Sequence, residues 1–190
     1  MKIFVISDIH GSLVALEKAL EAFNKEKADY LLICGDFLNH GPRNAIPEGY
    51  NTMETVKVLN QYKEKILAVR GNCDSEVDQM ILEFPMLPDY LTIILNNGNR
   101  IFVHHGHLYT EEYFSKFLTE KNIILSGHTH IPELEIKKIN NKNFIIMNPG
   151  SISIPKGVSL ASYGIIEEEG SKIKLKICEL SGNVVKSIDI

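Results

Sequence analysis

The chain has 190 residues, of which 44% are hydrophobic and 23% charged, so it can bury a core as one domain over residues 1–190. Its formal charge of -4 and its three arginines exclude the basic face that extended nucleic acid requires. The N-terminal apolar run, residues 3–6, is too short for a membrane span or a signal-peptide core, so we expect neither membrane insertion nor export.

The first half of the chain alternates β-branched-rich runs with segments of helical periodicity. From Leu13 to Phe23, for example, apolar residues recur at the spacing of one helix face. The alternation predicts three strand–helix units, with strands at 2–7, 30–34 and 66–69 and helices after Gly11, from about Met53 and at 75–84. The loop that opens at Asp36 is long enough to suggest a function.

The second half is richer in strands. Runs at 91–95 and 100–104 flank the turn signal Asn97-Gly98 and predict a hairpin, which a helix at 111–121 follows. Further short strands are predicted at 123–126, 133–139, 144–148, 162–167, 172–179 and 184–188. We therefore predict an α/β fold in which a two-sheet β-sandwich is flanked by helices.

Polar side chains gather where the predicted strands end. All seven histidines lie in four short fragments: 8–10, 39–41, 104–107 and 128–130. Asp36 and Asn72 occupy the same place after two further strands, and the carboxyl ends of strands are where sites assemble in α/β sheets. Imidazole and carboxylate groups together indicate a divalent transition metal, whereas the absence of paired cysteines argues against structural zinc or iron–sulfur sites.

The ordered fragments resemble the motifs of the calcineurin-like metallophosphoesterases. They are Ser7-Asp8-Ile9-His10-Gly11, Gly35-Asp36, Gly71-Asn72-Cys73-Asp74, His105-Gly106-His107 and Gly127-His128-Thr129-His130. Residues 39–44, 71–80 and 148–151 are similar, more narrowly, to the small bacterial YfcE-type phosphodiesterases. The resemblance implies a four-layer αββα metallophosphoesterase fold.

The resemblance also implies a ligand set for two divalent metal ions. One ion would be held by Asp8, His10, Asp36 and His130. The other would be held by Asp36, Asn72, His105 and His128, so that Asp36 bridges the pair. Manganese is the first expectation, with iron, zinc and nickel as alternatives. Hydrolysis would proceed by attack of a hydroxide held by both ions.

Further residues are candidates for catalysis or substrate contact. The candidate catalytic residues are Asp36, His40, Arg43 and Cys73, and the candidate substrate-binding residues are Asn39, His40, Arg43, Cys73 and His107. An arginine suits phosphate recognition, although Arg43 could instead form a structural salt bridge. His107 could support a ligand or contact the substrate, or it could have no function, and His104 could simply end a strand.

Cys73 bears on the type of ester. Many relatives carry histidine at this position and use it to bind phosphate or protonate the leaving oxygen, which a thiol does poorly. We therefore expect a phosphodiesterase acting on a small phosphate ester. The alternatives are a phosphomonoesterase or protein phosphatase, and a non-catalytic scaffold of the same fold.

The cysteines also indicate a compartment. Cys34, Cys73 and Cys178 are odd in number and widely spaced, as is usual in a reducing environment, so we expect a cytoplasmic protein. The oligomeric state stays open between a monomer and a homo-oligomer.

Overall fold

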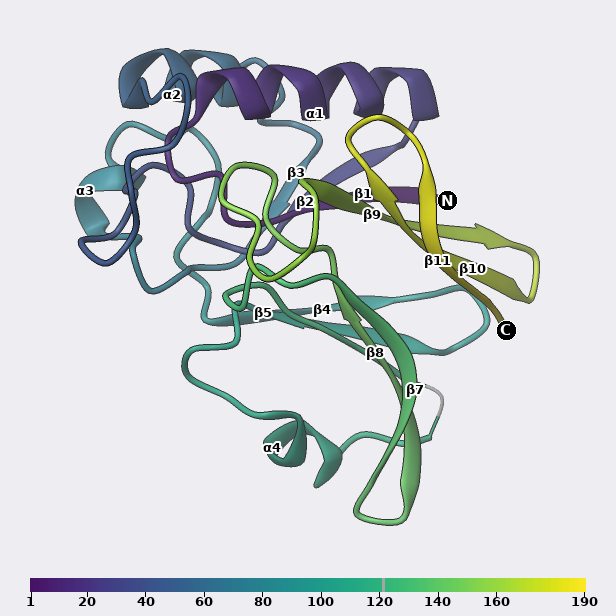
Figure 1. Cartoon of the computed structure of the whole chain (residues 1–190). Coiled ribbons are helices and arrows are strands. Elements are labelled where there is room, and N and C mark those ends of the chain that lie inside the picture. The colour runs from purple at the N-terminus through teal and green to yellow at the C-terminus, as the bar shows by residue number, and fades with distance from the viewer. Residues whose placement is uncertain (121) are drawn as a thin grey trace.

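Residues 1–120 and 122–190 are described by a computed structural model in which the strands form two mixed sheets (Figure 1). The strands are β1 (Lys2–Ile6), β2 (Tyr30–Ile33), β3 (Ile66–Ala68), β4 (Tyr90–Ile94), β5 (Arg100–His104), β6 (Ile123–Leu125), β7 (Glu133–Ile139), β8 (Lys142–Asn148), β9 (Ser162–Glu169), β10 (Lys172–Glu179) and β11 (Val184–Asp189). The helices are α1 (Leu13–Glu26), α2 (Thr52–Asn60), α3 (Glu76–Gln79) and α4 (Glu111–Ser115).

The first sheet has the strand order β11-β10-β9-β1-β2-β3. Its strands β1, β2 and β3 run parallel, because β1 and β2 are each followed by a helical crossover that carries the chain back along the sheet. Strand β9 joins β1 antiparallel and leads into β10 and β11. The carboxyl ends of β1, β2 and β3 therefore lie at one edge.

The second sheet has the order β4-β5-β6-β8-β7. Strands β4 and β5 form the predicted antiparallel hairpin, and β5, β6 and β8 are parallel. The carboxyl ends of β5 and β6 thus share an edge in the same way.

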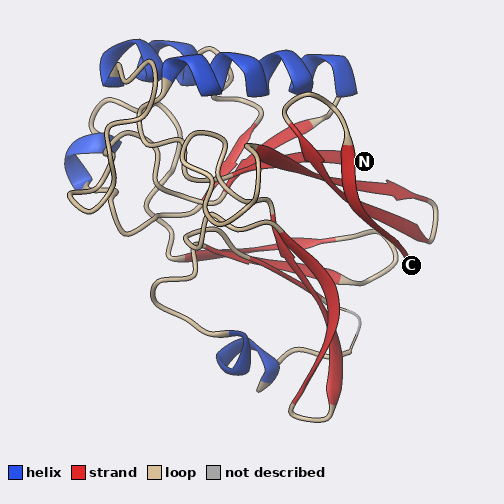
Figure 2. Ribbon diagram, viewed as in Figure 1, coloured by secondary structure: helices blue, strands red, loops and turns tan. Residues whose placement is uncertain are grey.

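The two sheets pack face to face, with helices on the outer faces (Figure 2). Val5 and Leu32 of the first sheet are buried in one cluster with Val103 and Leu125 of the second. Helices α1 and α2 cover the outer face of the first sheet, and α4 covers that of the second through Phe114. The predicted two-sheet fold with flanking helices is confirmed.

Helix α3 is much shorter than the predicted helix at 75–84. The side chain of Gln79 explains the early end, because its Nε2 donates to the carbonyl oxygens of Leu82 and Phe84 while its Oε1 accepts from Met86 N. These bonds hold the chain after Gln79 in turns. Leu82 and Phe84 are buried there, which accounts for the apolar pattern in this segment.

Helix α4 also ends earlier than predicted. Lys142 Nζ donates to the carbonyl oxygens of Ser115 and Leu118, at 3.0 Å each, and so occupies acceptors that a continuing helix would use. The last predicted helical residue, Lys121, lies outside the described residues. Within 1–120 and 122–190, none of these helices combines the length and the apolarity needed to cross a membrane.

Candidate metal centre

The sequence-predicted ligands come from loops that follow β1, β2, β3, β5 and β6. Five of them have a positive φ, between 49° and 68°: Asp8, His10, Asp36, His128 and His130. A non-glycine residue in this region costs about 1–3 kcal/mol and persists only where the surroundings impose it. Backbone bonds contribute to this, since Asp8 N donates to Gly35 O at 3.1 Å and His10 N donates to Asp36 O at 2.9 Å.

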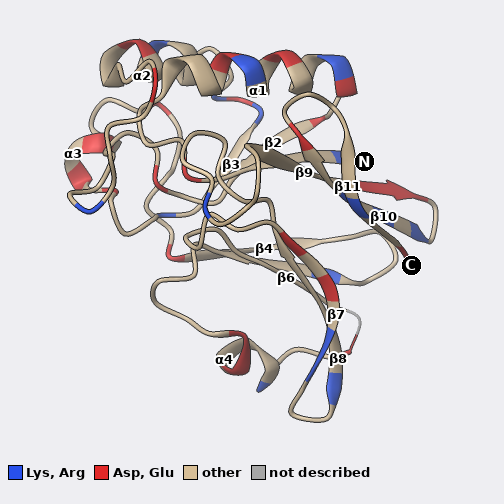
Figure 3. Cartoon of the chain, in the orientation of Figure 1, with Lys and Arg blue, Asp and Glu red and all other residues tan. Residues whose placement is uncertain are grey.

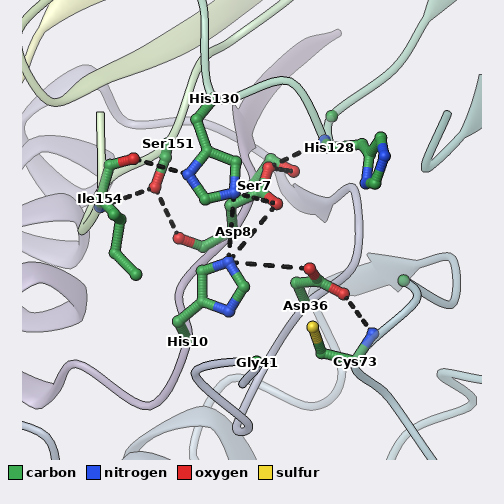
Figure 4. Close-up of polar contacts among 12 residues, drawn as sticks. Ser7, Asp8, His10, Asp36, Gly41, Cys73, His128, His130, Ser151 and Ile154 are labelled. Carbon is green, nitrogen blue, oxygen red and sulfur yellow. Dashed lines mark hydrogen bonds and ion pairs between the residues drawn. The ribbon is translucent and has the colours of Figure 1, made fainter. Parts of the chain in front are cut away.

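One cluster consists of Asp8, His10 and His130 (Figure 4). The Nε2 atom of His130 lies 3.2 Å from Asp8 Oδ1 and 3.3 Å from His10 Nε2. All three side chains are buried, although they come from loops after strands of different sheets. They bring two imidazole nitrogens and a carboxylate oxygen to one point.

Asp36 lies between this cluster and a second one. Its Oδ2 atom is 3.7 Å from His10 Nε2 and 3.5 Å from His105 Nε2. Its Oδ1 atom accepts a hydrogen bond of 2.8 Å from Cys73 N, which fixes the carboxylate plane. The free oxygen therefore faces histidines on both sides.

The second cluster is formed by Asn72, His105 and His128. His105 Nε2 lies 3.2 Å from Asn72 Oδ1, and the ring centroids of His105 and His128 are 5.1 Å apart. Figure 4 shows the His128 ring pointing away from the group of Asp8, His10 and His130. Its backbone N–H nevertheless donates to Asp8 Oδ2 at 3.0 Å, so the loop after β6 is tied to the loop after β1.

Three of the imidazoles are oriented by backbone carbonyl groups. The Nδ1 atoms of His10, His105 and His130 lie 2.6–2.7 Å from the carbonyl oxygens of Asn39, Cys34 and Ile154. A carbonyl oxygen can only accept, so each Nδ1 carries the proton. Each Nε2 then faces the centre, which is the orientation that metal-binding histidines adopt.

The charges in the centre are coupled. Burial opposes ionisation of Asp36, but the hydrogen bond and charge of His105 outweigh it, so the pKa of Asp36 is held well below its ordinary value. Burial likewise opposes protonation of His105, yet the hydrogen bond that His105 donates to Asp36 and the nearby carboxylates raise its pKa to about 9.

These donors fit a divalent cation. Asp8 Oδ1 is fully buried and has no hydrogen-bond partner within residues 1–120 and 122–190, although it lies beside the Nε2 atoms of His10 and His130. A buried carboxylate oxygen without a partner is costly, and a cation there would satisfy it. Carboxylate, imidazole and amide oxygen donors are those expected for manganese, iron, zinc or nickel.

Two side chains that were not predicted from the sequence support the centre. The carboxylate of Asp74 accepts from the backbone N–H groups of Asp36, Phe37 and Gly71, at 2.7–2.8 Å. The Ser151 hydroxyl donates to Asp8 O at 2.8 Å. Both residues lie within the motif fragments 71–80 and 148–151. Their place in these motifs could have indicated a function.

A cavity of about 450 Å³ opens onto the centre. Asp36, Asn72, His128 and His130 line it together with Cys73 and the predicted substrate residue Arg43. Lys156, which sequence analysis did not select, also lines it. The cavity therefore brings the candidate ligands and two cationic side chains together.

Three other predicted residues are absent from the lining among the described parts of the chain. The His40 ring packs edge-on against Tyr50, with centroids 5.5 Å apart. Asn39 contributes its carbonyl to His10 and its side chain to Gly41 N. His107 lies beside His105, with ring centroids 5.3 Å apart, and burial followed by the charge of His105 lowers its pKa.

Arg70, which follows strand β3, and His104, which ends strand β5, have other surroundings. Arg70 forms an ion pair of 2.6 Å with Asp89. His104 is buried against Phe114, and burial lowers its pKa to about 4.

Two packed mixed sheets with Asp, His and Asn side chains at their shared edge agree with the expected metallophosphoesterase fold and site. The family model for the calcineurin-like phosphoesterase superfamily domain matches residues 1–171, and the chain belongs to this superfamily. Phosphodiesterase YfcE of Escherichia coli K12 is 46% identical over 169 residues, which are 89% of either chain.

Solved structures agree with this assignment. The structure of YfcE, a phosphoesterase from E. coli, matches with a TM-score of 0.89 and 42% identity, covering 99% of this chain and 98% of that one. A structure of Entamoeba histolytica Vps29 complexed with Zn²⁺ matches with a TM-score of 0.60 and 21% identity, over 100% and 98% of the two chains. The latter is a likeness of fold alone.

Proposed function

We propose that the protein is a metal-dependent phosphodiesterase that hydrolyses a small phosphodiester with two divalent cations. The position of Asp36 carries this proposal, because its Oδ2 faces histidines of both clusters, at 3.7 and 3.5 Å. One cation would be held by Asp8, His10, Asp36 and His130, and the other by Asp36, Asn72, His105 and His128. Manganese is the first candidate, with iron, zinc and nickel as alternatives.

The bound cations would lower the pKa of a water molecule, so that hydroxide is available at neutral pH to attack phosphorus. They would also neutralise charge on the phosphate oxygens. The protein's own groups prepare the centre for this. The carbonyl groups of Cys34, Asn39 and Ile154 keep each Nε2 turned inward. Arg43 extends from the loop after β2 at the cavity and can donate to a phosphate oxygen.

Cys73 favours diesters over monoesters. Its thiol lines the cavity, and burial followed by the charge of Asp36 raises its pKa to about 12. The thiol therefore stays neutral, and it is a weak hydrogen-bond donor. Without a good proton donor at this position, esters with stable leaving groups should react best, and YfcE, the relative described above, is named a phosphodiesterase.

The test is hydrolysis of bis(p-nitrophenyl) phosphate and p-nitrophenyl phosphate by protein stripped with a chelator and then reloaded with Mn²⁺. We expect no turnover in the stripped protein, recovery on reloading, and a higher kcat/KM for the diester. Full activity without metal, or a preference for the monoester, would contradict the proposal.

Two Cys73 variants sharpen this test. Cys73→Ser should change kcat/KM little, since serine preserves a small neutral side chain. Cys73→His should introduce a proton donor and raise the rate for poor leaving groups most, within the 10²–10⁴-fold range of general acid catalysis. An inactive serine variant would give the thiol a role of its own.

A non-catalytic scaffold of the same fold is the alternative from another functional class. The complete set of donor side chains favours the enzyme. Cys34, Cys73 and Cys178 are free thiols, which supports a reducing compartment such as the cytoplasm.

A further inference from the structure

The cavity at the candidate centre carries two cationic side chains from different loops. Arg43 lies between β2 and α2, and Lys156 lies between β8 and β9. Over residues 1–120 and 122–190, neither side chain forms an ion pair or a protein hydrogen bond, and Asp36 is the only acidic residue in the described lining. Both cationic side chains thus face the cavity without a carboxylate partner in the described parts of the chain.

The backbone of Lys156 is anchored to the centre. Its N–H donates to His130 O at 3.2 Å, and its carbonyl oxygen accepts from the Ser159 hydroxyl at 2.5 Å. Two residues earlier, the Ile154 carbonyl accepts from His130 Nδ1 at 2.6 Å. Lys156 therefore has a set position beside a candidate ligand, while its side chain is exposed at the cavity.

Some other lysines of the chain are paired with carboxylates. Lys57, Lys63 and Lys137 each form an ion pair of 2.6 Å with a glutamate. Figure 3 shows acidic and basic residues close together on the β9–β10 hairpin. A lysine beside a cavity and without a carboxylate partner is instead available to an anion.

The charge balance indicates what that anion is. A phosphodiester group carries one negative charge. Two divalent cations would exceed the combined charge of the Asp8 and Asp36 carboxylates, and the excess would already compensate the attacking hydroxide and the scissile phosphate at the proposed centre. Arg43 and Lys156 then add positive charge that one diester phosphate does not need.

We propose that the natural substrate is a phosphodiester with a second phosphate group, which Lys156 binds together with Arg43. The inference rests on the proposed function and narrows its substrate class. Lysine and arginine both form charge-assisted hydrogen bonds with phosphate, and the arginine fork adds direction. A cavity of about 450 Å³ is within the range typical of small-molecule sites.

The experiment compares two chromogenic substrates with the same leaving group, using the Mn²⁺-loaded protein. One is the p-nitrophenyl ester of thymidine 5'-phosphate, and the other is the same diester with an added 3'-phosphate. We expect the added phosphate to lower KM about tenfold in the native protein, as one charge-assisted contact would. Added salt should reduce this difference.

Three variants assign the effect to Lys156. Lys156→Gln should make the two KM values nearly equal, because the added phosphate loses its contact. Lys156→Arg should preserve the native ratio of the two KM values. Lys138→Gln, which removes an exposed lysine from strand β7, should leave the ratio unchanged. Thermal unfolding of each variant verifies that it is folded.

The outcomes separate the two proposals. Equal KM values for both substrates in the native protein, or an unchanged ratio in Lys156→Gln, would overturn the inference and leave the phosphodiesterase proposal standing. Hydrolysis of neither substrate would overturn the proposed function and this inference with it.

Discussion

The imidazoles of the candidate centre derive their orientation from main-chain carbonyl groups. His10, His105 and His130 each donate Nδ1–H to a carbonyl oxygen at 2.6–2.7 Å. Rotation of any of these rings would break that bond and leave a buried group without a partner. The inward position of Nε2 is therefore a property of the loops that carry the carbonyl groups.

Asp36→Asn should be the most damaging single substitution in the centre. It removes the charge that faces both His10 and His105, whereas His10→Ala affects one cluster. We expect Asp36→Asn to lose both cations and to reduce kcat/KM by more than the about 10–100-fold typical of supporting residues. Bound metal per chain and activity would be measured on the same samples. A variant that retains both metals would rule out the bridging role.

His105 should make cation binding dependent on pH. Burial lowers the pKa of His105, but the hydrogen bond that His105 donates to Asp36 and the nearby carboxylate charges outweigh burial and raise the pKa to about 9 in the metal-free protein. A ligand must be neutral, so binding at neutral pH displaces a proton and is weakened as pH falls below about 9. Mn²⁺ affinity should rise about tenfold per pH unit between about 6 and 9.

Titration calorimetry in buffers of different ionisation enthalpy would measure the released proton directly. His105→Asn, which has no ionisable group at this position, should bind more weakly and without this proton release. Native protein that binds Mn²⁺ with no proton release would refute the assignment of His105.

At the scale of elements, the loops after β2 and β3 act as one unit. Asp74, in the loop after β3, accepts N–H groups from Asp36 and Phe37 in the loop after β2 and from Gly71 in its own loop. Gly71 allows the close approach, because a Cβ atom there would collide with the Asp36 carboxylate and backbone. A single carboxylate thus sets the separation of two loops that each present a candidate ligand.

Asp74→Asn should weaken this unit. The new amide nitrogen would face a backbone N–H, leaving a donor unsatisfied at a cost of about 1–3 kcal/mol in the free energy of unfolding. Urea denaturation and metal content would be measured together, and both should fall. Asp78→Asn is the matched control, because Asp78 caps only the short helix α3 and should affect stability without metal loss.

At the scale of the whole molecule, the centre lies across the seam between the two sheets. Asp8 and Asp36 follow strands of the first sheet, and His105 and His130 follow strands of the second. The spacing of the sheets therefore sets the spacing of the donors. Packing far from the centre should influence metal binding for this reason.

Gly164→Val tests this coupling. Gly164 lies in β9, where a Cβ atom would overlap Met147 of the opposite sheet and lie 3.3 Å from Val5 Cβ. Overpacking should cost about 1–3 kcal/mol of stability and lower Mn²⁺ affinity. Adding Met147→Ala should recover part of both losses. Unchanged metal affinity in a destabilised single variant would show that the centre does not depend on sheet spacing.

Local sequence patterns were sufficient for much of the fold. The helical spacing from Leu13 to Phe23 predicts α1, and the Asn97-Gly98 signal predicts the β4–β5 hairpin, because both patterns reflect short-range conformational preferences. The predicted ends of α3 and α4 were wrong because these ends depend on contacts between segments distant in the sequence or on a side chain that folds back on the backbone. Gln79 and Lys142 capture carbonyl groups through side chains, and helical periodicity does not report such bonds.

The sequence by itself determined the superfamily and a candidate ligand set, because each motif is a short continuous segment that can be recognised without the structure. Only the tertiary structure decided that Asp74 joins two loops and that Lys156 lies beside His130 at the cavity. These relations connect segments far apart in the chain. They depend on which strands pair and on how the sheets pack, and that geometry arises from the whole core rather than from any one motif.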